Sequence, residues 1–158
     1  MKNRYRRVPS ECILSPEWDG LPPDARYVYL VCLVSPRQTA PGILDTSLRG
    51  LQFETGLSRK RLETALLALQ TARIVQVLEN GGIWIRNAFR WSSGNPDFVR
   101  SALRVVAHRW EEIYDDFIED NRATLDYYNV DQDEGREYFK HGCHIVSPPS
   151  PDDEPSRS

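Results

Sequence analysis

The sequence has few cysteines, no long hydrophobic run and no secretory leader. Cys12, Cys32 and Cys143 are odd in number and widely spaced, which argues against a disulfide framework and indicates reduced thiols. No apolar run approaches the roughly 20 residues that a membrane-spanning helix needs. The N-terminus is basic, but no apolar segment follows it as in a signal peptide. These absences predict a cytoplasmic protein that does not have a membrane as its partner.

Motifs for catalysis and for metal binding are also missing. The chain has no phosphate-binding loop, no Ser-x-x-Lys motif, no His-Glu pair on a helix and no nucleophile elbow. The segment His141-Gly142-Cys143-His144 contains three candidate metal ligands in four residues. Structural zinc sites usually take four ligands from two separated pairs, and no second pair exists here. We therefore predict a protein that is not an enzyme and that uses neither a metal nor a cofactor.

Charge is divided unevenly along the chain. Residues 1–110 contain 16 Lys and Arg against 9 Asp and Glu, a balance of +7. Residues 111–158 contain 4 against 14, a balance of −10, so the net charge of −3 conceals the split. A basic folded part suits a polyanion, and an acidic end suits a solvated tail or a basic partner. The plainer interpretation is that surface charge simply drifts along the sequence.

The segment 45–86 has the order of elements of a winged helix-turn-helix. Asp45 or Thr46 is expected to cap a first short helix. Thr55-Gly56-Leu57 is expected to form the turn, because glycine allows a positive φ. A second helix should then extend over 58–72, with Ser58 as its N-cap.

Strand patterns flank this helix pair. The β-rich runs 74–78 and 83–86 surround a Gly-containing turn and predict a hairpin, and 42–45 predicts a short strand. Residues 4–20 are interpreted as an extended arm with a short strand. A buried helix is expected to begin at Pro23. Its main apolar face should consist of Tyr27, Leu30, Val31 and Val34.

Positive side chains gather at the start of the second helix, at Arg59, Lys60 and Arg61. A helix N-terminus directs free N–H groups and positive dipole outward, so DNA phosphates or base edges are well placed there. We predict binding to double-stranded DNA, with Arg also able to bind guanine bidentately. The further candidate contacts are Thr64, Arg49, Arg86 and the N-terminal arm residues Arg4, Arg6 and Arg7. The alternative is a winged helix that contacts only proteins.

A resemblance to a known family rests on several short motifs. They are the basic N-terminal arm, Trp18-Asp19-Gly20-Leu21, Ala25-Arg26, Gly42-Ile43-Leu44, Thr55-Gly56-Leu57-Ser58, and Ile83-Trp84-Ile85-Arg86-Asn87 followed by Asn95-Pro96. Through them, the segment 18–91 resembles the N-terminal winged-helix domain of phage and prophage replication-initiator (replisome-organiser) proteins. The resemblance implies DNA binding and recruitment of replication proteins in the host cytoplasm or nucleoid. Family members often carry a longer C-terminal region that contacts a helicase or its loader, so transcription control stays open beside replication initiation.

A long amphipathic helix is predicted over 97–128, continuous or broken near Asn121. Its aromatic residues Trp110, Tyr114 and Phe117 would either pack on the chain's own domain or form a dimer or partner interface, where such side chains are good anchors. Its exposed carboxylates would form a solvated face, repel DNA or bind a basic protein.

The predicted fold is therefore α+β: a winged helix-turn-helix with a C-terminal helical extension and a disordered acidic tail. The expected divisions are a basic arm (1–20), a winged-helix domain (21–95), an amphipathic helical extension (96–128) and an acidic, largely disordered tail (129–158). The predicted function is phage-type DNA binding in replication initiation or transcription control. The alternative is a non-enzymatic module that binds a host protein through the winged helix or the acidic helix.

Overall fold

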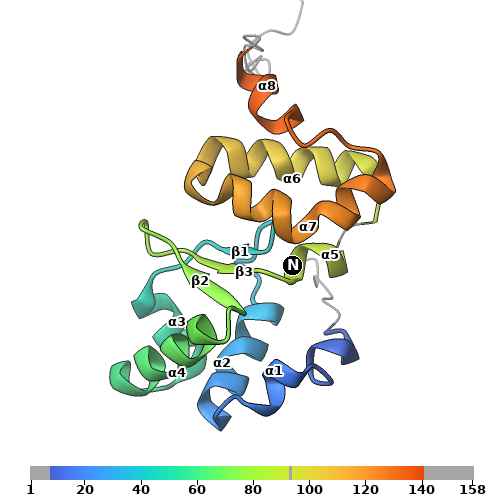
Figure 1. The fold of residues 1–158 in the computed structure, drawn as a ribbon. Helices are drawn as coiled ribbons and strands as arrows, with labels where there is room; N and C mark the ends of the chain where they lie inside the picture. Colours follow the sequence, from blue (N-terminus) through green and yellow to red (C-terminus); the bar gives the residue numbers. More distant parts are fainter. Residues whose placement is uncertain (1–7, 93, 141–158) are drawn as a thin grey trace, which may run out of the picture.

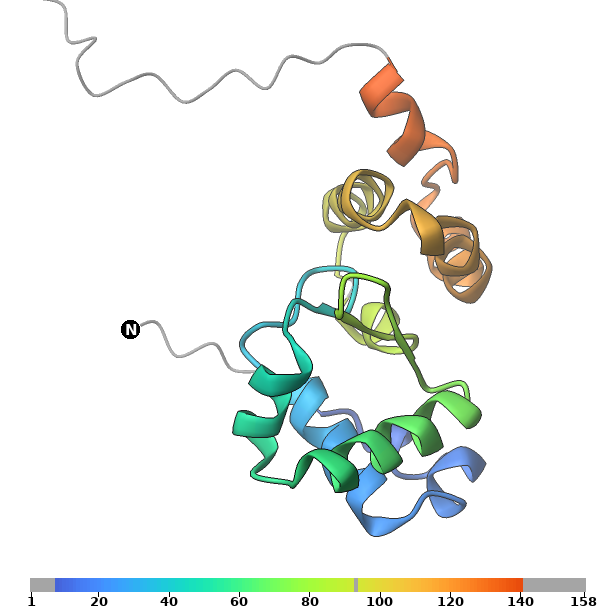
Figure 2. The same cartoon turned by 90° about the vertical axis from the view of Figure 1, so that its left-hand side faces the viewer.

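The computed structural model describes residues 8–92 and 94–140, and these form an α+β fold. Figure 1 shows a lower layer of helices, a small antiparallel sheet and an upper layer of helices. Figure 2, turned by 90°, shows the same order with the two long upper helices seen nearly end-on. No helix among the described residues is long and apolar enough to span a bilayer.

The chain enters the lower layer through short helical turns. The first two are η1 (Ser10–Cys12) and α1 (Pro16–Asp19). Ser15 caps α1, because its Oγ accepts a hydrogen bond from the Trp18 amide at 3.3 Å, and Pro16 occupies the first turn. The expected extended arm with a strand is therefore wrong for residues 8–20. Residues 1–7, which include Arg4, Arg6 and Arg7, lie outside the described residues.

Helix α2 (Pro23–Val34) forms as predicted, but it is rotated relative to the expected face. Val28 and Cys32 are fully buried, whereas Tyr27 is 43% and Val34 48% exposed. Both sides of this helix are apolar, so its internal pattern does not decide which side faces the core. The packing of α4 (Arg59–Thr71) against α2 determines which side of α2 is buried, because Leu62 and its neighbours on α4 share one core with the buried side chains of α2.

The sheet has the strand order β1-β3-β2 and is antiparallel throughout. Its strands are β1 (Ile43–Leu44), β2 (Val75–Val77) and β3 (Ile83–Ile85). The register pairs Ile43 with Trp84 and Val75 with Ile85. The predicted strand and hairpin are thus confirmed.

The two faces of the sheet enter two separate cores. Side chains alternate across a strand, so Ile83 and Ile85 pack downward with α2 and α4. Trp84 points the other way, has no exposed surface and packs with the upper layer. The small sheet therefore separates the two cores and contributes side chains to both, and in this way it positions the lower helices relative to the upper ones.

The upper layer consists of a bent helix pair and two short helices. Its elements are α5 (Ala88–Ser92), α6 (Pro96–Arg109), η2 (Glu111–Ile113), α7 (Tyr114–Tyr128) and α8 (Glu134–Lys140). The predicted long helix does break, but at Trp110 (φ −142°, ψ 50°) and not near Asn121. Trp110, Tyr114 and Phe117 are at most 1% exposed and belong to the upper core. They pack on the chain's own domain, which leaves no surface on them for a partner.

Helix α8 lies within the segment that was expected to be a disordered tail. Glu134 forms ion pairs with Arg100 at 3.3 Å and Arg104 at 3.1 Å, and Arg136 pairs with Glu111 at 2.7 Å. Gly135 is buried against α6. The tail prediction is therefore wrong for 134–140, and residues 141–158, with the His141–His144 segment, lie outside the described residues.

Candidate nucleic-acid interface

The turn between α3 (Leu48–Thr55) and α4 fixes how α4 is presented. Gly56 ends α3 with φ +69°, a left-handed conformation that suits glycine, and its amide donates to Gln52 O at 2.9 Å. Leu57 is buried beneath the turn. Ser58 then caps α4, its Oγ accepting from the Arg61 amide at 3.4 Å. The prediction for this turn is confirmed, although α3 is capped by Ser47 and not by Asp45 or Thr46.

Two arginines at the start of α4 form exposed ion pairs. Arg59 Nε lies 2.8 Å from Glu63 Oε1, and the Arg59 side chain is 74% exposed. Arg61 donates through Nε and Nη2 to both carboxylate oxygens of Asp24, at 2.8 and 2.7 Å, and is 61% exposed. Hydrogen bonding to the guanidinium lowers the pKa of the Asp24 carboxyl. Because exposed pairs are weak and screened by salt, both guanidinium groups remain able to exchange their carboxylate for a phosphate.

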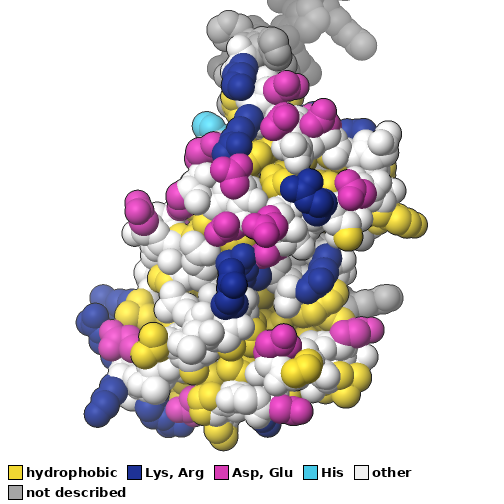
Figure 3. Space-filling view, viewed as in Figure 1, with side chains coloured by type: hydrophobic (Ala, Val, Ile, Leu, Met, Phe, Trp, Pro, Cys, Tyr) yellow, Lys and Arg dark blue, Asp and Glu magenta, His cyan; other side chains and the backbone are white. Residues whose placement is uncertain are grey.

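Lys60 lies between these two arginines and is exposed. No ion pair engages Lys60 within residues 8–92 and 94–140, and the same holds for exposed Arg49 on α3. Figure 3 shows Lys and Arg side chains gathered at the left-hand edge of the lower layer, over α3 and α4, whereas Asp and Glu are more numerous over the upper layer. The edge at α3 and α4 therefore presents positive charge to solvent.

Arg86 does not lie on this surface as a free cation. It follows β3 and donates from Nε and Nη2 to both oxygens of Asp120 on α7, at 2.7 and 3.0 Å. Only 16% of its side chain is exposed, and its guanidinium lies 4.8 Å from the centre of the Trp84 ring. The structure thus contradicts the expected DNA contact by Arg86, because the residue joins the sheet to the upper layer.

Exposed apolar side chains on these helices are a feature that the prediction did not include. Leu67 on α4 is 63% exposed, and Phe53 on α3 is 88% exposed. On a helical wheel of 59–71, Leu67 lies on the same face as Lys60 and Thr64. This alignment is the sequence signal from which the exposure of Leu67 could have been predicted. The signal for Phe53 is its spacing of four residues from Arg49.

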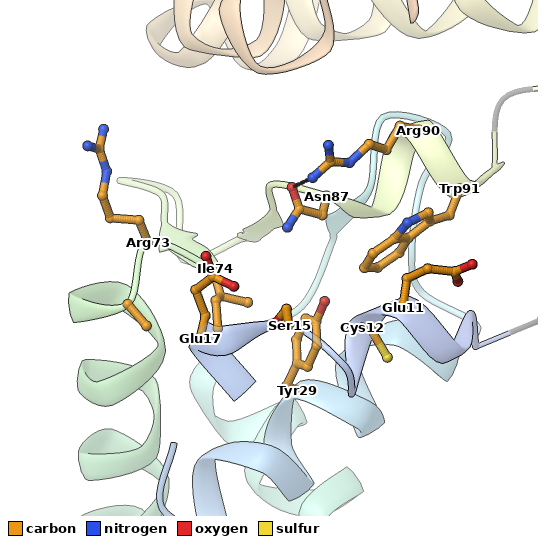
Figure 4. Close-up of a pocket in the computed structure, with 11 residues that line it drawn as sticks. Glu11, Cys12, Ser15, Glu17, Tyr29, Arg73, Ile74, Asn87, Arg90 and Trp91 are labelled. Atoms are coloured by element: carbon orange, nitrogen blue, oxygen red, sulfur yellow. Dashed lines mark hydrogen bonds between the residues drawn. The ribbon is translucent and has the colours of Figure 1, made fainter. Parts of the chain in front are cut away.

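A separate cavity of about 610 Å³ lies between α1, α2 and α5 (Figure 4). Tyr29 projects from α2 toward Asn87 and Arg90 on the opposite wall, and Arg90 donates to the Asn87 amide oxygen. Burial raises the pKa of the Tyr29 hydroxyl, and burial followed by the charge of Glu11 raises the pKa of the Cys12 thiol. Both groups are therefore protonated at neutral pH, and neither is an activated nucleophile.

Metal-binding geometry is absent from the part of the chain that the structure describes, where no three His, Cys, Asp or Glu side chains form a group that could hold an ion. Comparison with protein-family models, with curated proteins and with solved structures finds no match to this chain. The geometry of its own residues therefore carries the functional argument.

Proposed function

We propose that residues 21–95 form a winged-helix domain that binds double-stranded DNA through α3 and α4. The observation that carries this proposal is the triplet Arg59, Lys60 and Arg61 on the exposed first turn of a helix that follows a tight turn. The order of β1, α3, α4 and the β2–β3 hairpin along the chain supports a winged helix. In this proposal, the hairpin turn at 79–82 is the wing.

The first turn of α4 suits a polyanion for two independent reasons. Its amide groups and helix dipole provide partial positive charge, and three cationic side chains add to it. Phosphates of DNA would replace Glu63 and Asp24 as the partners of Arg59 and Arg61. Since each pair lies at the surface, the exchange requires only side-chain rotation and leaves the helix packing unchanged. Lys60 and Arg49 would reach phosphates without giving up a carboxylate.

We further propose that the protein acts in phage-type replication initiation or transcription control within the host cytoplasm. The support is the resemblance of segment 18–91 to replication-initiator winged-helix domains, together with the basic edge at α3 and α4. The two roles make different demands on the DNA. An initiator recruits replication proteins to an origin, whereas a regulator occupies a promoter and needs no such recruitment.

Fluorescence anisotropy with a labelled 30-bp duplex tests DNA binding. The logarithm of the association constant falls with the logarithm of the salt concentration, and each lost phosphate contact makes this fall less steep by about 0.9. The slope of the triple variant R59A/K60A/R61A should therefore be less negative by about 2.7. The same relation predicts about a 100-fold loss of affinity at 0.15 M salt. The melting temperature should hardly change, because all three side chains are exposed.

A matched control removes three cations from the upper layer in the variant R109A/R122A/K140A, which has the same net charge as the test variant. The control should retain most of the wild-type affinity and salt slope. Equal losses in both variants would mean that net charge, and not the α4 site, determines binding. Absence of binding by the wild-type protein at 0.05 M salt would refute the proposal.

A second candidate function is binding of a basic protein by the upper layer. The observation that favours it is a set of exposed carboxylates on η2 and α7, namely Glu112, Asp116 and Glu119, for which the described residues provide no ion pair. This function predicts a protein complex that forms without DNA and is weakened by E112Q/D116N/E119Q. Capture of a host protein in nuclease-treated lysate by wild type, but not by this variant, would support it.

A further inference from the structure

The most outward line of α4 is formed by Lys60, Thr64, Leu67 and Thr71. The spacing of four, three and four residues places them on one face of the helix, opposite Leu62, Leu66 and Leu69 of the core, which are at most 5% exposed. Arg59 and Arg61 are each offset from this line by one residue, on its two sides. If α4 enters a DNA groove, as the proposed function holds, the line from Thr64 to Thr71 meets the base edges, and Arg59, Lys60 and Arg61 meet the flanking phosphates.

The chemistry of this line changes along the helix. Lys60 provides a cation at its start. Thr64 Oγ1 donates to Lys60 O at 2.9 Å, and Thr71 Oγ1 donates to Leu67 O at 2.8 Å, so both hydroxyl hydrogens are engaged inside the helix. Leu67 has no polar atom in its side chain and is 63% exposed. Leu67 therefore offers only methyl groups at the centre of this line, and the two threonines beside it have their hydroxyl hydrogens engaged and can act there only as acceptors or through their methyl groups.

The neighbouring polar side chains lie beside this line and not on it. Gln70 Oε1 accepts a hydrogen bond from the Val77 amide at 3.3 Å, and Arg59, Arg61 and Glu63 lie on the flanks of the helix. A polar readout of guanine or adenine from the centre of this surface would need a free donor at the centre, and Leu67 occupies that position.

We propose that the Thr64-Leu67-Thr71 line reads the C5-methyl groups of thymine in the major groove, so that the protein prefers DNA rich in A·T pairs. This inference rests on the proposed function and specifies the DNA that it selects. Among the four bases of DNA, thymine alone carries a methyl group that lies in the major groove, and apolar side chains contact this group. Complementary charge supports the same occupant, because Arg59, Lys60 and Arg61 adjoin the apolar line.

The test compares duplexes that differ only in this methyl group. A 24-bp duplex of alternating A·T pairs is matched with one of alternating A·U pairs, and a G·C duplex with one that contains 5-methylcytosine. Dissociation constants are measured by anisotropy at 0.1 M salt. The wild-type protein should bind the thymine duplex about fourfold more tightly for each methyl group that it buries. It should likewise prefer 5-methylcytosine to cytosine, because the methyl group occupies the same position in the groove.

Two leucine variants distinguish the site from general apolar binding. L67A should reduce the thymine-to-uracil ratio of affinities toward one, while L14A, which removes a leucine that is 78% exposed elsewhere, should leave the ratio unchanged. Equal wild-type affinities for the thymine and uracil duplexes would overturn the inference while leaving DNA binding intact. Failure to bind any of the four duplexes would instead overturn the proposed function, and the inference with it.

Discussion

The pairing of Arg86 with Asp120 makes a prediction that separates stability from DNA binding. The two side chains are 16% and 24% exposed and share two charge-assisted hydrogen bonds of 2.7 and 3.0 Å. Hydrogen bonds to charged groups contribute about 1.5–3 kcal/mol, and Asp120 can be partly rehydrated when its partner is removed. We therefore expect R86A to lower the free energy of unfolding by about 2 kcal/mol. For a chain of this size, that loss corresponds to a fall in melting temperature of about 4–8 °C.

Urea denaturation of wild type, R86A, D120A and the double variant measures this pair as a thermodynamic cycle. The coupling energy should be about 1 kcal/mol or more, because both hydrogen bonds need both residues. DNA affinity at a temperature where R86A is folded should stay within about twofold of wild type. Additive losses in the cycle would refute the pairing. A loss of DNA affinity as large as that of R59A/K60A/R61A would return Arg86 to the DNA-binding surface.

Three further predictions concern packing and pH. F117A should cost about 3–5 kcal/mol in urea denaturation, because fully buried Phe117 lies 5.0 Å from the Phe89 ring and 6.1 Å from the Trp84 ring. G135A should increase the hydrogen exchange of the α8 amides, because a Cβ there would lie 2.7 Å from Leu103 O and push α8 away from α6. Unchanged exchange rates in α8 would argue against the packing of α8 on α6. Burial raises the pKa of Cys32 from 9.0 to about 12, so its contribution to stability should be complete below pH 9 and be lost as pH rises toward 12. Urea titrations at pH 8 and pH 10.5 should show a smaller decrease for C32A than for wild type.

Local signals account for the parts of the fold that the sequence predicts correctly. Gly56, Ser58 and the Leu62-Leu66-Leu69 face define the turn and α4 within a few residues, because capping and helical periodicity act over one or two turns. The hairpin at 74–86 is equally local. Ser15-Pro16 is also a local helix-start signal, which makes the helical turns of the N-terminal segment readable from the sequence after all.

Long-range contacts decide two other features that were predicted wrongly, the break in the long helix and the position of Arg86. The apolar spacing of Val106, Trp110, Ile113 and Phe117 continues without a break, and no proline or glycine marks the bend at Trp110. All four side chains belong to the upper core, so the fold buries the whole stripe although the helix bends within it. The position of the Arg86 side chain depends on Asp120, which is 34 residues away in the sequence. No local sequence signal predicts that pairing.

Ion pairs in the fold neutralise part of the positive charge that the sequence concentrates in residues 1–110. Several cations of the basic half pair with carboxylates that lie beyond residue 110: Arg86 pairs with Asp120 at 2.7 Å, and Arg104 pairs with Glu134 at 3.1 Å. The balance of +7 over residues 1–110 therefore overstates the positive charge that DNA would meet. Among the described residues, Lys60 on α4 and Arg49 on α3 are exposed cations that no carboxylate pairs.

The acidic upper layer then restricts how a duplex can lie on the protein. At 0.1 M salt, electrostatic interactions extend about 10 Å, so repulsion by the carboxylates of this layer would act most strongly on DNA that runs along α7. If the protein binds DNA as proposed, a duplex that follows the exposed line of α4 from Lys60 to Thr71 would meet attraction from the cations at the start of that helix. The distribution of charge would then favour the same face of α4 as the helix geometry does.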